Sequence, residues 1–438
     1  IKDKTGNFAR KFVLDYCDVI REEACGLSDE SEDGRKKSPR EAHIELANRY
    51  GNASPVSGVE KMLRSLLVEA DPGFDQKPDM VNCLNGLLDL HTGEFREVWP
   101  SDRLTVRANA EWKGDVPCPL WENFMAERFP NPETRDFVQR MCGLFITGNS
   151  PEKAFFIVRG EKDSGKSVFC EFLHWLLGGY GNKVSKETLV RSKNGENKAQ
   201  EKSVELVGRR YIYVDESASG DQIDDAFIKE ITGGDVTLKF RKLYEQVQEV
   251  KAEFTLLLAT NFKPRITGND EAIWRRCHLI EFGESIPKSR QIGDFKERLK
   301  SEASGILAWM VEGYRKWKED GLEQPDEVRS WTNEYRDEND PLGRFLGDCY
   351  EISEEVTDYM TPGALHSHYL AWAEENDISI KTFSKPSSLS RAVRSRWKIV
   401  NTPSPGQKRT SKERKLFHMR ALTRFRPTDG LEDWVNEN

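Results

Sequence analysis

Residues 157–167 read IVRGEKDSGKS, in which two glycines, a lysine and a serine fit the pattern G-x-x-x-x-G-K-[ST] of a phosphate-binding loop. An apolar strand-like run (FFIV) precedes the loop, and a helix-like run (VFCEFLHWLL) follows it. Glycines let backbone amides curl around an anion at a helix N-terminus, where unpaired N–H groups and the helix dipole favour negative charge. The stretch therefore predicts a nucleotide site whose residues are Gly160, Glu161, Lys162, Asp163, Ser164, Gly165, Lys166 and Ser167.

Such a site needs a cation on the phosphates and ligands for Mg²⁺. We expect Lys166 to reach the β- and γ-phosphates and the Ser167 hydroxyl to ligate Mg²⁺. A second apolar run, YIYVDE, ends in Asp215 and Glu216. Because open parallel sheets bind ligands at the carboxyl ends of their strands, Asp215 is expected to support Mg²⁺. Glu216 is expected to polarise the attacking water.

A third apolar run, TLLLATN, ends in Thr260 and Asn261. An amide at this place can sense the γ-phosphate or position the lytic water, although a polar strand end is also ordinary. The run AIWRRCHLIEF then presents Arg275 and Arg276. A guanidinium offered to the nucleotide of a neighbouring subunit would stabilise transition-state charge, and the sequence does not rank the two arginines.

The wider pattern predicts an α/β fold. Between 154 and 282, short apolar runs alternate with helical patterns, which indicates a P-loop NTPase core with a mostly parallel sheet covered on both faces. The other patterns predict helices over 8–27 and 40–70, a small strand pair over 81–95, two helices within 117–148, a helix over 293–320, and a linker or exposed helix over 319–340. We therefore expect a helical N-terminal region (1–116), a motor (117–340) and a C-terminal domain (341–438).

The C-terminal domain is strongly basic. The whole chain has 438 residues and a net charge of −8, yet residues 381–426 contain fourteen Lys or Arg and one acid. Such a block favours a nucleic-acid partner, and a solvated basic tail is the alternative. Three helices followed by the runs RWKIVNT and LFHMRALTRF fit a winged helix that binds DNA or docks a protein. Its candidate phosphate contacts are Arg391, Arg394, Arg396, Lys408, Arg409, Lys412, Arg414 and Lys415.

A second basic segment, VTLKFRKLYEQVQEVKAEF (236–254), has two β-prone runs around a polar middle and predicts a hairpin. Positive side chains there would grip DNA phosphates without reading bases, whereas a solvated hairpin without a ligand is the alternative. Its candidate DNA contacts are Lys239, Arg241 and Lys242.

GEKDSGKS, YIYVDE, IKEITGGDVTLKFRKLYE and LLLATNFKP resemble the A, B, B′ and C motifs of superfamily 3 helicases, in the phage/plasmid primase-helicase family related to poxvirus helicase-primase. In this loop Glu161 to Ser164 occupy places where the family often has an extra glycine and an asparagine. The resemblance implies an AAA+-like motor that assembles as a ring, expected to be a hexamer. It would hydrolyse ATP between subunits and draw single-stranded DNA through its pore from 3′ to 5′, with the hairpin lining that pore.

We therefore expect an ATP-dependent DNA helicase of a phage, plasmid or other mobile element, acting on single-stranded and forked DNA. One alternative is a ring ATPase that packages nucleic acid or remodels proteins, and another is an origin-binding protein in which nucleotide only sets assembly. No apolar run approaches the roughly 20 residues of a membrane span, which predicts a cytoplasmic protein, most naturally in a bacterial host. The chain begins at Ile1 and carries no primase signature, so any primase or polymerase module is expected upstream or in trans.

Overall fold

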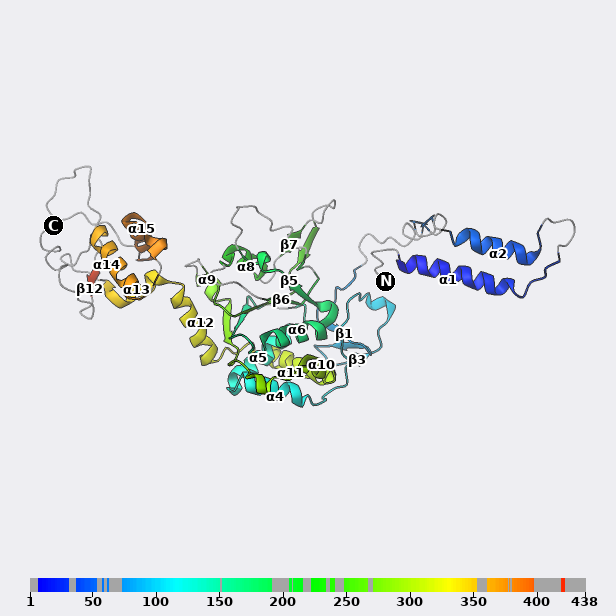
Figure 1. Cartoon of the computed structure of the whole chain (residues 1–438), viewed down its shortest axis with the longest axis horizontal. Coiled ribbons are helices and arrows are strands. Elements are labelled where there is room, and N and C mark those ends of the chain that lie inside the picture. Colours follow the sequence, from blue (N-terminus) through cyan, green and yellow to red (C-terminus); the bar gives the residue numbers. More distant parts are fainter. Residues whose placement is uncertain are drawn as a thin grey trace.

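We analysed a computed structural model of the chain (Figure 1). It describes residues 7–30, 37–52, 57–58, 61–62, 73–149, 152–190, 205–206, 208–215, 222–233, 237–240, 248–266, 271–352, 361–376, 378, 380–397 and 419–421. Near the N-terminus, α1 (Asn7–Ala24) and α2 (Pro39–Tyr50) pack together as a helical hairpin, and Cys17 and Ala47 are buried between them. Ser38 begins α2 with a capping box that includes Glu41. The predicted helical N-terminal region is therefore confirmed over these two helices.

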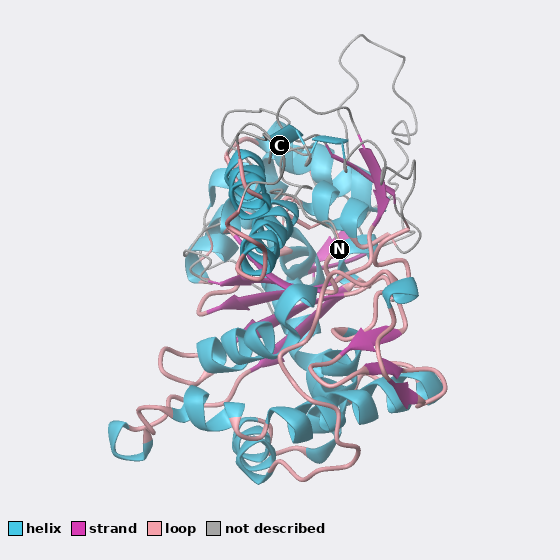
Figure 2. Cartoon of the chain, turned by 90° about the vertical axis from the view of Figure 1, so that its right-hand side faces the viewer, coloured by secondary structure: helices cyan, strands magenta, loops and turns pink. Residues whose placement is uncertain are grey.

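The centre of the molecule is a five-stranded sheet in which every neighbouring pair is parallel (Figure 2). In spatial order its strands are β10 (Cys277–Glu281), β4 (Phe155–Arg159), β9 (Thr255–Thr260), β6 (Tyr211–Asp215) and β5 (Gly181–Val184). The three inner strands are continuous apolar runs, as expected for strands covered on both faces. The predicted α/β fold with a mostly parallel sheet is confirmed.

Two hydrophobic clusters cover the two faces of this sheet. On one face α4 (Pro119–Arg128), α5 (Pro132–Leu144), α6 (Lys166–Leu177), α10 (Phe295–Lys300) and α11 (Ala303–Asp320) enclose a cluster centred on Trp121. On the other face lie α8 (Asp225–Ile231), α9 (Glu271–Trp274) and α12 (Asp326–Glu338). The predicted helix over 293–320 is divided at 301–302 into α10 and α11.

The helix α12 was expected to be a linker or an exposed helix. The helix is present, but its exposure was predicted wrongly, because Val328, Thr332 and Tyr335 are buried. The Thr332 hydroxyl accepts a hydrogen bond from the backbone amide of Leu279 in the edge strand β10, at 3.0 Å. The acidic exterior of α12 concealed this apolar stripe, which packs along the edge strand β10 and contributes Val328 to one hydrophobic cluster and Tyr335 to the other.

The segment 80–96 forms a small antiparallel sheet. Instead of the predicted pair there are three strands, β1 (Met80–Asn82), β2 (Leu87–Asp89) and β3 (Phe95–Arg96). The buried Arg210 guanidinium donates to the carbonyls of Ile146, Lys77 and Met80, which joins this sheet to the start of β6. Val81 and Leu88 belong to the same hydrophobic cluster as α4, α5, α6, α10 and α11. The three domain limits remain predictions.

The closest contact between helices joins α5 and α11. A Cβ atom added to Gly313 would lie 2.0 Å from the backbone oxygen of Gln139, and one added to Gly143 would lie 2.2 Å from the backbone nitrogen of Tyr314. Real side chains do not tolerate such distances, so these two glycines set the separation of the helices.

Gly313→Ala is expected to lower the free energy of unfolding by about 3 kcal/mol or more, because the two helices must move apart. Urea unfolding followed by tryptophan fluorescence measures this loss. Gly293→Ala is the matched control, since Gly293 is exposed in a loop and a Cβ atom there would meet nothing within 4 Å. Equal stability of the two variants would contradict the close contact.

His278 on β10 makes stability depend on pH. Its ring lies 5.3 Å from Phe156 and 5.6 Å from Phe137, and its buried Nδ1 has no hydrogen-bond partner among the residues that the structure describes. Burial lowers the pKa of His278 from 6.5 to about 4. As pH falls from about 6.5 to 4, the unfolded chain binds this proton before the folded protein does. Stability is therefore lost through that window, by roughly 3 kcal/mol.

His278→Phe should remove much of this acid sensitivity while keeping the ring contacts. The measurement is the free energy of unfolding at pH 7 and at pH 4.5 for the wild type, for His278→Phe and for the exposed control His91→Gln. We expect a flatter pH profile for His278→Phe alone, and identical slopes for all three proteins would refute the assignment.

The C-terminal region consists of α13 (Pro341–Cys349), α14 (Pro362–Glu375) and α15 (Pro386–Trp397), with a strand pair made by β11 (Tyr350–Ile352) and β12 (Met419–Ala421). The three predicted helices are confirmed, and β12 lies in the predicted run LFHMRALTRF. The other predicted strand, RWKIVNT, is wrong at Arg396 and Trp397, which end α15, and its remaining residues lie outside the described ones. The winged-helix assignment stays a prediction.

All eight cysteines are free thiols, and all but Cys25 are buried. Among the described helices, none is both long enough and apolar enough to cross a membrane.

Candidate functional site

The loop 160–165 joins the end of β4 to the first residue of α6, Lys166. Gly160 must be glycine, because a Cβ atom there would lie 2.8 Å from the carbonyl oxygen of Phe282. Gly165 has φ +98°, and Asp163 also has a positive φ of +62°. These left-handed residues turn the chain sharply between strand and helix. The predicted strand–loop–helix context is therefore present.

Lys166 is folded back onto its own loop. Its Nζ donates to the carbonyl oxygens of Gly160 at 2.8 Å and Glu161 at 2.6 Å, and lies 3.2 Å from Ser164 Oγ. Burial lowers the pKa of the Lys166 ammonium. The side chain is thus a buried cation beside helix-terminal amides, and a phosphate could replace its carbonyl partners. Ser167 lies exposed in the first turn of α6.

The parallel register brings the other predicted residues to the same end of the sheet, where the carboxyl ends of its strands lie. Arg159, the last residue of β4, pairs with Thr260, and Asp215 pairs with Ala259. Asp215 and Asn261 therefore follow strands that end beside the loop. Asn261 is exposed, whereas Asp215 is partly buried. Glu216 lies outside the described residues.

Asp215 already has a cationic partner that the sequence did not indicate. Lys183 on β5 places its Nζ 3.4 Å from Asp215 Oδ2 and 5.7 Å from the centre of the Tyr213 ring. The polar run GNKV gave no signal for this strand. A metal ion at Asp215 would compete with Lys183 for the carboxylate.

A second ion pair was also missed at this edge. Arg159 Nη1 lies 2.9 Å and 3.1 Å from the two carboxylate oxygens of Glu281, the last residue of β10. Arg159 directly precedes the loop, and Glu281 is its register partner on β10. The carboxyl ends of the strands therefore hold paired charges of both signs around loop 160–165.

Arg275 and Arg276 lie at the opposite end of the sheet. They directly precede β10, whose five residues run parallel to β4, so a strand of roughly 16 Å separates them from the loop edge. The Arg275 side chain is 75% exposed and lies 3.8 Å from Glu271. Arg276 instead donates to the carbonyl oxygen of Ala272 in the preceding helix α9, at 2.8 Å.

The structure places only some of the predicted DNA contacts. The hairpin is confirmed as β7 (Thr237–Phe240) paired with β8 (Gln248–Lys251), and Lys239 faces Glu249 in register. Arg391 and Arg394 lie three residues apart on α15, where Arg391 is exposed and Arg394 is partly buried. Arg396 is also on α15. The predicted contacts outside the described residues are Arg241, Lys242, Lys408, Arg409, Lys412, Arg414 and Lys415.

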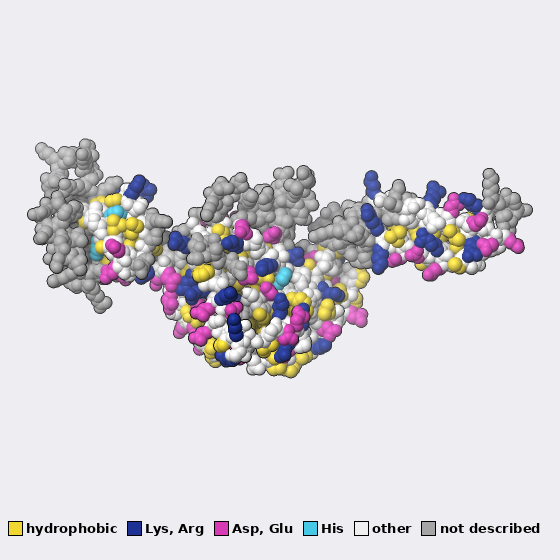
Figure 3. Space-filling model, viewed as in Figure 1, with side chains coloured by type: hydrophobic (Ala, Val, Ile, Leu, Met, Phe, Trp, Pro, Cys, Tyr) yellow, Lys and Arg dark blue, Asp and Glu magenta, His cyan; other side chains and the backbone are white. Residues whose placement is uncertain are grey.

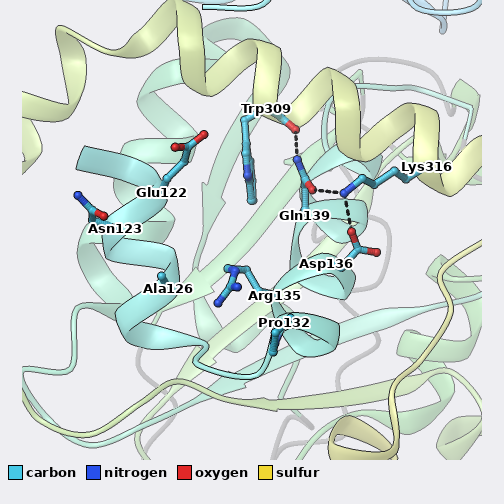
Figure 4. Close-up of a pocket in the computed structure, with 9 residues that line it drawn as sticks. All are labelled: Glu122, Asn123, Ala126, Pro132, Arg135, Asp136, Gln139, Trp309 and Lys316. Carbon is cyan, nitrogen blue, oxygen red and sulfur yellow. Dashed lines mark hydrogen bonds and ion pairs between the residues drawn. The ribbon is translucent and has the colours of Figure 1, made fainter. Parts of the chain in front are cut away.

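A cavity of about 390 Å³ lies apart from this edge, between α4, α5 and α11 (Figure 4). Its polar lining is internally paired, because Lys316 bonds to Asp136 and Gln139, and Gln139 donates to the carbonyl of Trp309. No loop residue lines it. The cavity is therefore not part of the candidate nucleotide site.

Comparison with known proteins gives two family matches. Residues 2–130 match the family described as "D5 N terminal like", and residues 158–276 match a "Family of unknown function (DUF5906)". The second match spans the loop and strands β4, β6 and β9.

Similar curated proteins come from viruses. One is "Putative helicase L207/L206" of Acanthamoeba polyphaga mimivirus, 26% identical over 331 residues, which covers 70% of this chain and 34% of that protein. Another is "Putative primase C962R" of African swine fever virus (strain Badajoz 1971 Vero-adapted), 22% identical over 322 residues, which covers 65% of this chain and 33% of that protein. The chain thus spans about a third of the length of these relatives.

A solved structure, "The apo structure of NrS-1 C terminal region (305-718)", has a similar fold with TM-score 0.50 and 10% identity, over 83% of this chain and 90% of that one. At this identity the likeness concerns the fold alone. The D5-like N-terminal match and the viral relatives, which are named as putative helicases and primases, support a primase-helicase family for this chain.

Proposed function

We propose that the chain is the motor of an ATP-dependent DNA helicase that works as a ring, expected to be hexameric, and moves 3′ to 5′ on single-stranded DNA. One observation carries this proposal. The nucleotide loop, Asp215 and Asn261 lie at one edge of the sheet, whereas Arg275 and Arg276 lie at the other. Those arginines cannot reach their own nucleotide, so an active site made from both sets requires two subunits.

The residues at the loop edge suit Mg²⁺-ATP. A hydroxyl from Ser167 and a carboxylate from Asp215 are the hard oxygen ligands that Mg²⁺ prefers. When bound, Mg²⁺ would neutralise charge on the β- and γ-phosphates. Lys166 would exchange its loop carbonyls for phosphate oxygens, and Asn261 would hold the attacking water or the γ-phosphate. Glu216 keeps its proposed role of polarising that water.

The proposed DNA path uses the hairpin β7–β8 and the basic C-terminal region. Figure 3 shows acidic and basic side chains interspersed over the visible face of the central body, without one dominant basic area. This mixed surface fits DNA contact through a few lysines and arginines on projecting elements, namely Lys239 on β7 and Arg391 on α15, more than broad adsorption. An AAA+-like ring would place such a hairpin in its pore.

The viral relatives favour a viral or other mobile-element replication protein, with a primase or polymerase module elsewhere in a longer chain or in trans. A cytoplasmic location in the host cell fits this role. The two alternatives use the same nucleotide loop but predict no unwinding. One is a ring ATPase that packages nucleic acid or remodels proteins, and the other is an origin-binding protein.

Strand displacement on forked DNA with a 3′ or a 5′ single-stranded tail tests the proposal. We expect ATP-dependent unwinding only with the 3′ tail, together with ATP hydrolysis that single-stranded DNA stimulates. Hydrolysis stimulated without unwinding would support a packaging or remodelling ATPase, and negligible hydrolysis would support an origin-binding protein. Either result would overturn the helicase assignment.

A further inference from the structure

Arg128, the last residue of α4, is a buried arginine without a buried acidic partner among the described residues. The residue is 8% exposed, and its Nε is buried without a hydrogen-bond partner. The carboxylate nearest to its guanidinium belongs to Glu127, whose side chain is largely exposed and lies 3.5 Å away. Burying a guanidinium in this way costs free energy unless hydrogen bonds compensate for its lost hydration.

The guanidinium reaches two segments that are distant in sequence. Arg128 Nη1 donates to the carbonyl oxygen of Ser164 at 3.3 Å, inside the nucleotide loop, and to that of Glu284 at 2.8 Å, just after β10. Both bonds come from one guanidinium nitrogen, whose two N–H groups have fixed directions in the guanidinium plane, whereas the three N–H donors of a lysine rotate freely. Arg128 therefore ties the nucleotide loop to the segment that follows the edge strand.

The bond to Ser164 has a direct consequence for phosphate binding. In a trans peptide unit the C=O and N–H groups point in opposite directions. Because the Ser164 carbonyl points toward Arg128, the amide of Gly165 in the same peptide unit points away from it. That amide is the last one before α6 begins at Lys166. The bond thus orients a loop donor at the helix N-terminus, where an anion would sit.

Residues of α4 and of the segment after β10 also contact the same loop. A Cβ atom at Gly165 would lie 3.1 Å from the Phe124 ring, which is on the same helix as Arg128. The Ile286 amide donates to the Asp163 carbonyl at 3.0 Å. The loop is therefore clamped between the C-terminal half of α4 and residues 282–286. Phe124, Arg128 and Ile286 all lie outside the phosphate-loop motif.

We propose that Arg128 is a positioning residue for the nucleotide loop: by holding the Ser164 carbonyl it presents the Gly165 amide to the phosphates. This inference rests on the proposed ATP site, and it predicts that loss of Arg128 weakens nucleotide binding through loop disorder rather than through loss of a phosphate contact.

The test compares Arg128→Lys and Arg128→Gln with Arg135→Gln. Arg135 is a matched control because its guanidinium also donates to two backbone carbonyls, those of Phe129 and Pro130, but does not touch the loop. Two readouts are needed: hydrogen–deuterium exchange of residues 160–167 without nucleotide, and the dissociation constant for Mg²⁺-ATP. Thermal unfolding shows which variants are folded. If Arg128→Gln does not fold, Arg128→Lys, which keeps the positive charge, still tests the inference.

We expect faster exchange across 160–167 and an approximately tenfold higher dissociation constant in both Arg128 variants, and neither change in Arg135→Gln. Unchanged exchange in the Arg128 variants would overturn the inference even if no protein bound ATP. Failure of the wild type to bind ATP, together with altered exchange in the Arg128 variants, would instead reject the nucleotide proposal and retain the clamp. Equal ATP affinity of the wild type and both Arg128 variants would also overturn the inference.

Discussion

Lys166→Ala is expected to lower the rate of ATP hydrolysis at least about a hundredfold and to abolish unwinding, because it removes the buried cation at the phosphate site. Among the described residues, this ammonium donates hydrogen bonds to the carbonyls of Gly160 and Glu161 and to the Ser164 hydroxyl. A phosphate would therefore gain a charge-assisted bond without having to break an ion pair. The steady-state ATPase rate with single-stranded DNA measures the effect.

Lys162→Ala is the matched control for this variant. Lys162 is predicted to contribute its backbone amide to the phosphate site, and its side chain is exposed. Lys162→Ala keeps that amide and changes the loop charge by the same amount as Lys166→Ala. We expect its ATPase rate to stay within about threefold of the wild type at physiological salt, where exposed charges are screened. If the two variants lost equal activity, overall loop charge rather than the buried Lys166 would be responsible.

The sequence predicts the residues at the carboxyl ends of the strands well, because each of them directly follows or ends a recognisable apolar run. The inner strands β4, β6 and β9 are uninterrupted apolar runs, and each ends directly in residues with functional side chains. Parallel strands necessarily bring those ends to one edge, so the meeting of the loop, Asp215 and Asn261 follows from the fold class alone.

The supporting contacts could not be predicted because they join segments far apart in the chain. Glu302 accepts hydrogen bonds from the amides of Leu120 and Trp121 at the start of α4, at 3.0 and 3.1 Å. Arg128 reaches the loop from the other end of that helix. Neither residue has a local pattern that marks it, since a charged residue at a helix end is usually solvated. Only the packed structure shows that α4 is fixed at both ends.

The polar edge strand β5 was missed for a different reason. Its sequence, GNKV, has neither the apolar run nor the regular alternation that indicates a strand, yet it pairs with β6 over four residues. An edge strand needs less apolar surface because one side of it lacks a neighbouring strand. With this strand unrecognised, the pairing of Lys183 with Asp215 was also beyond prediction.

Arg275→Ala is expected to lower the ATPase rate about a thousandfold with little change in ATP affinity, because an arginine supplied in trans acts mainly on the transition state. The sequence left Arg275 and Arg276 equivalent, and the structure separates them. Arg275 projects into solvent, whereas Arg276 donates to the Ala272 carbonyl of the preceding helix α9. We therefore expect Arg276→Ala to reduce thermal stability more and hydrolysis less than Arg275→Ala does.

A mixing experiment distinguishes action in trans from a defect within one subunit. Lys166→Ala retains its arginine and Arg275→Ala retains its loop, so a mixed ring contains seams where an intact loop meets an intact arginine. Each variant alone should be inactive, whereas an equimolar mixture, allowed to exchange subunits, should recover a measurable fraction of the wild-type ATPase rate. Recovery must fail in a mixture of Lys166→Ala with a Lys166→Ala/Arg275→Ala double variant, which has no intact loop. If the first mixture stayed as inactive as its components while forming mixed oligomers, the two residues would not share a site between subunits, because the sheet already keeps them apart within one.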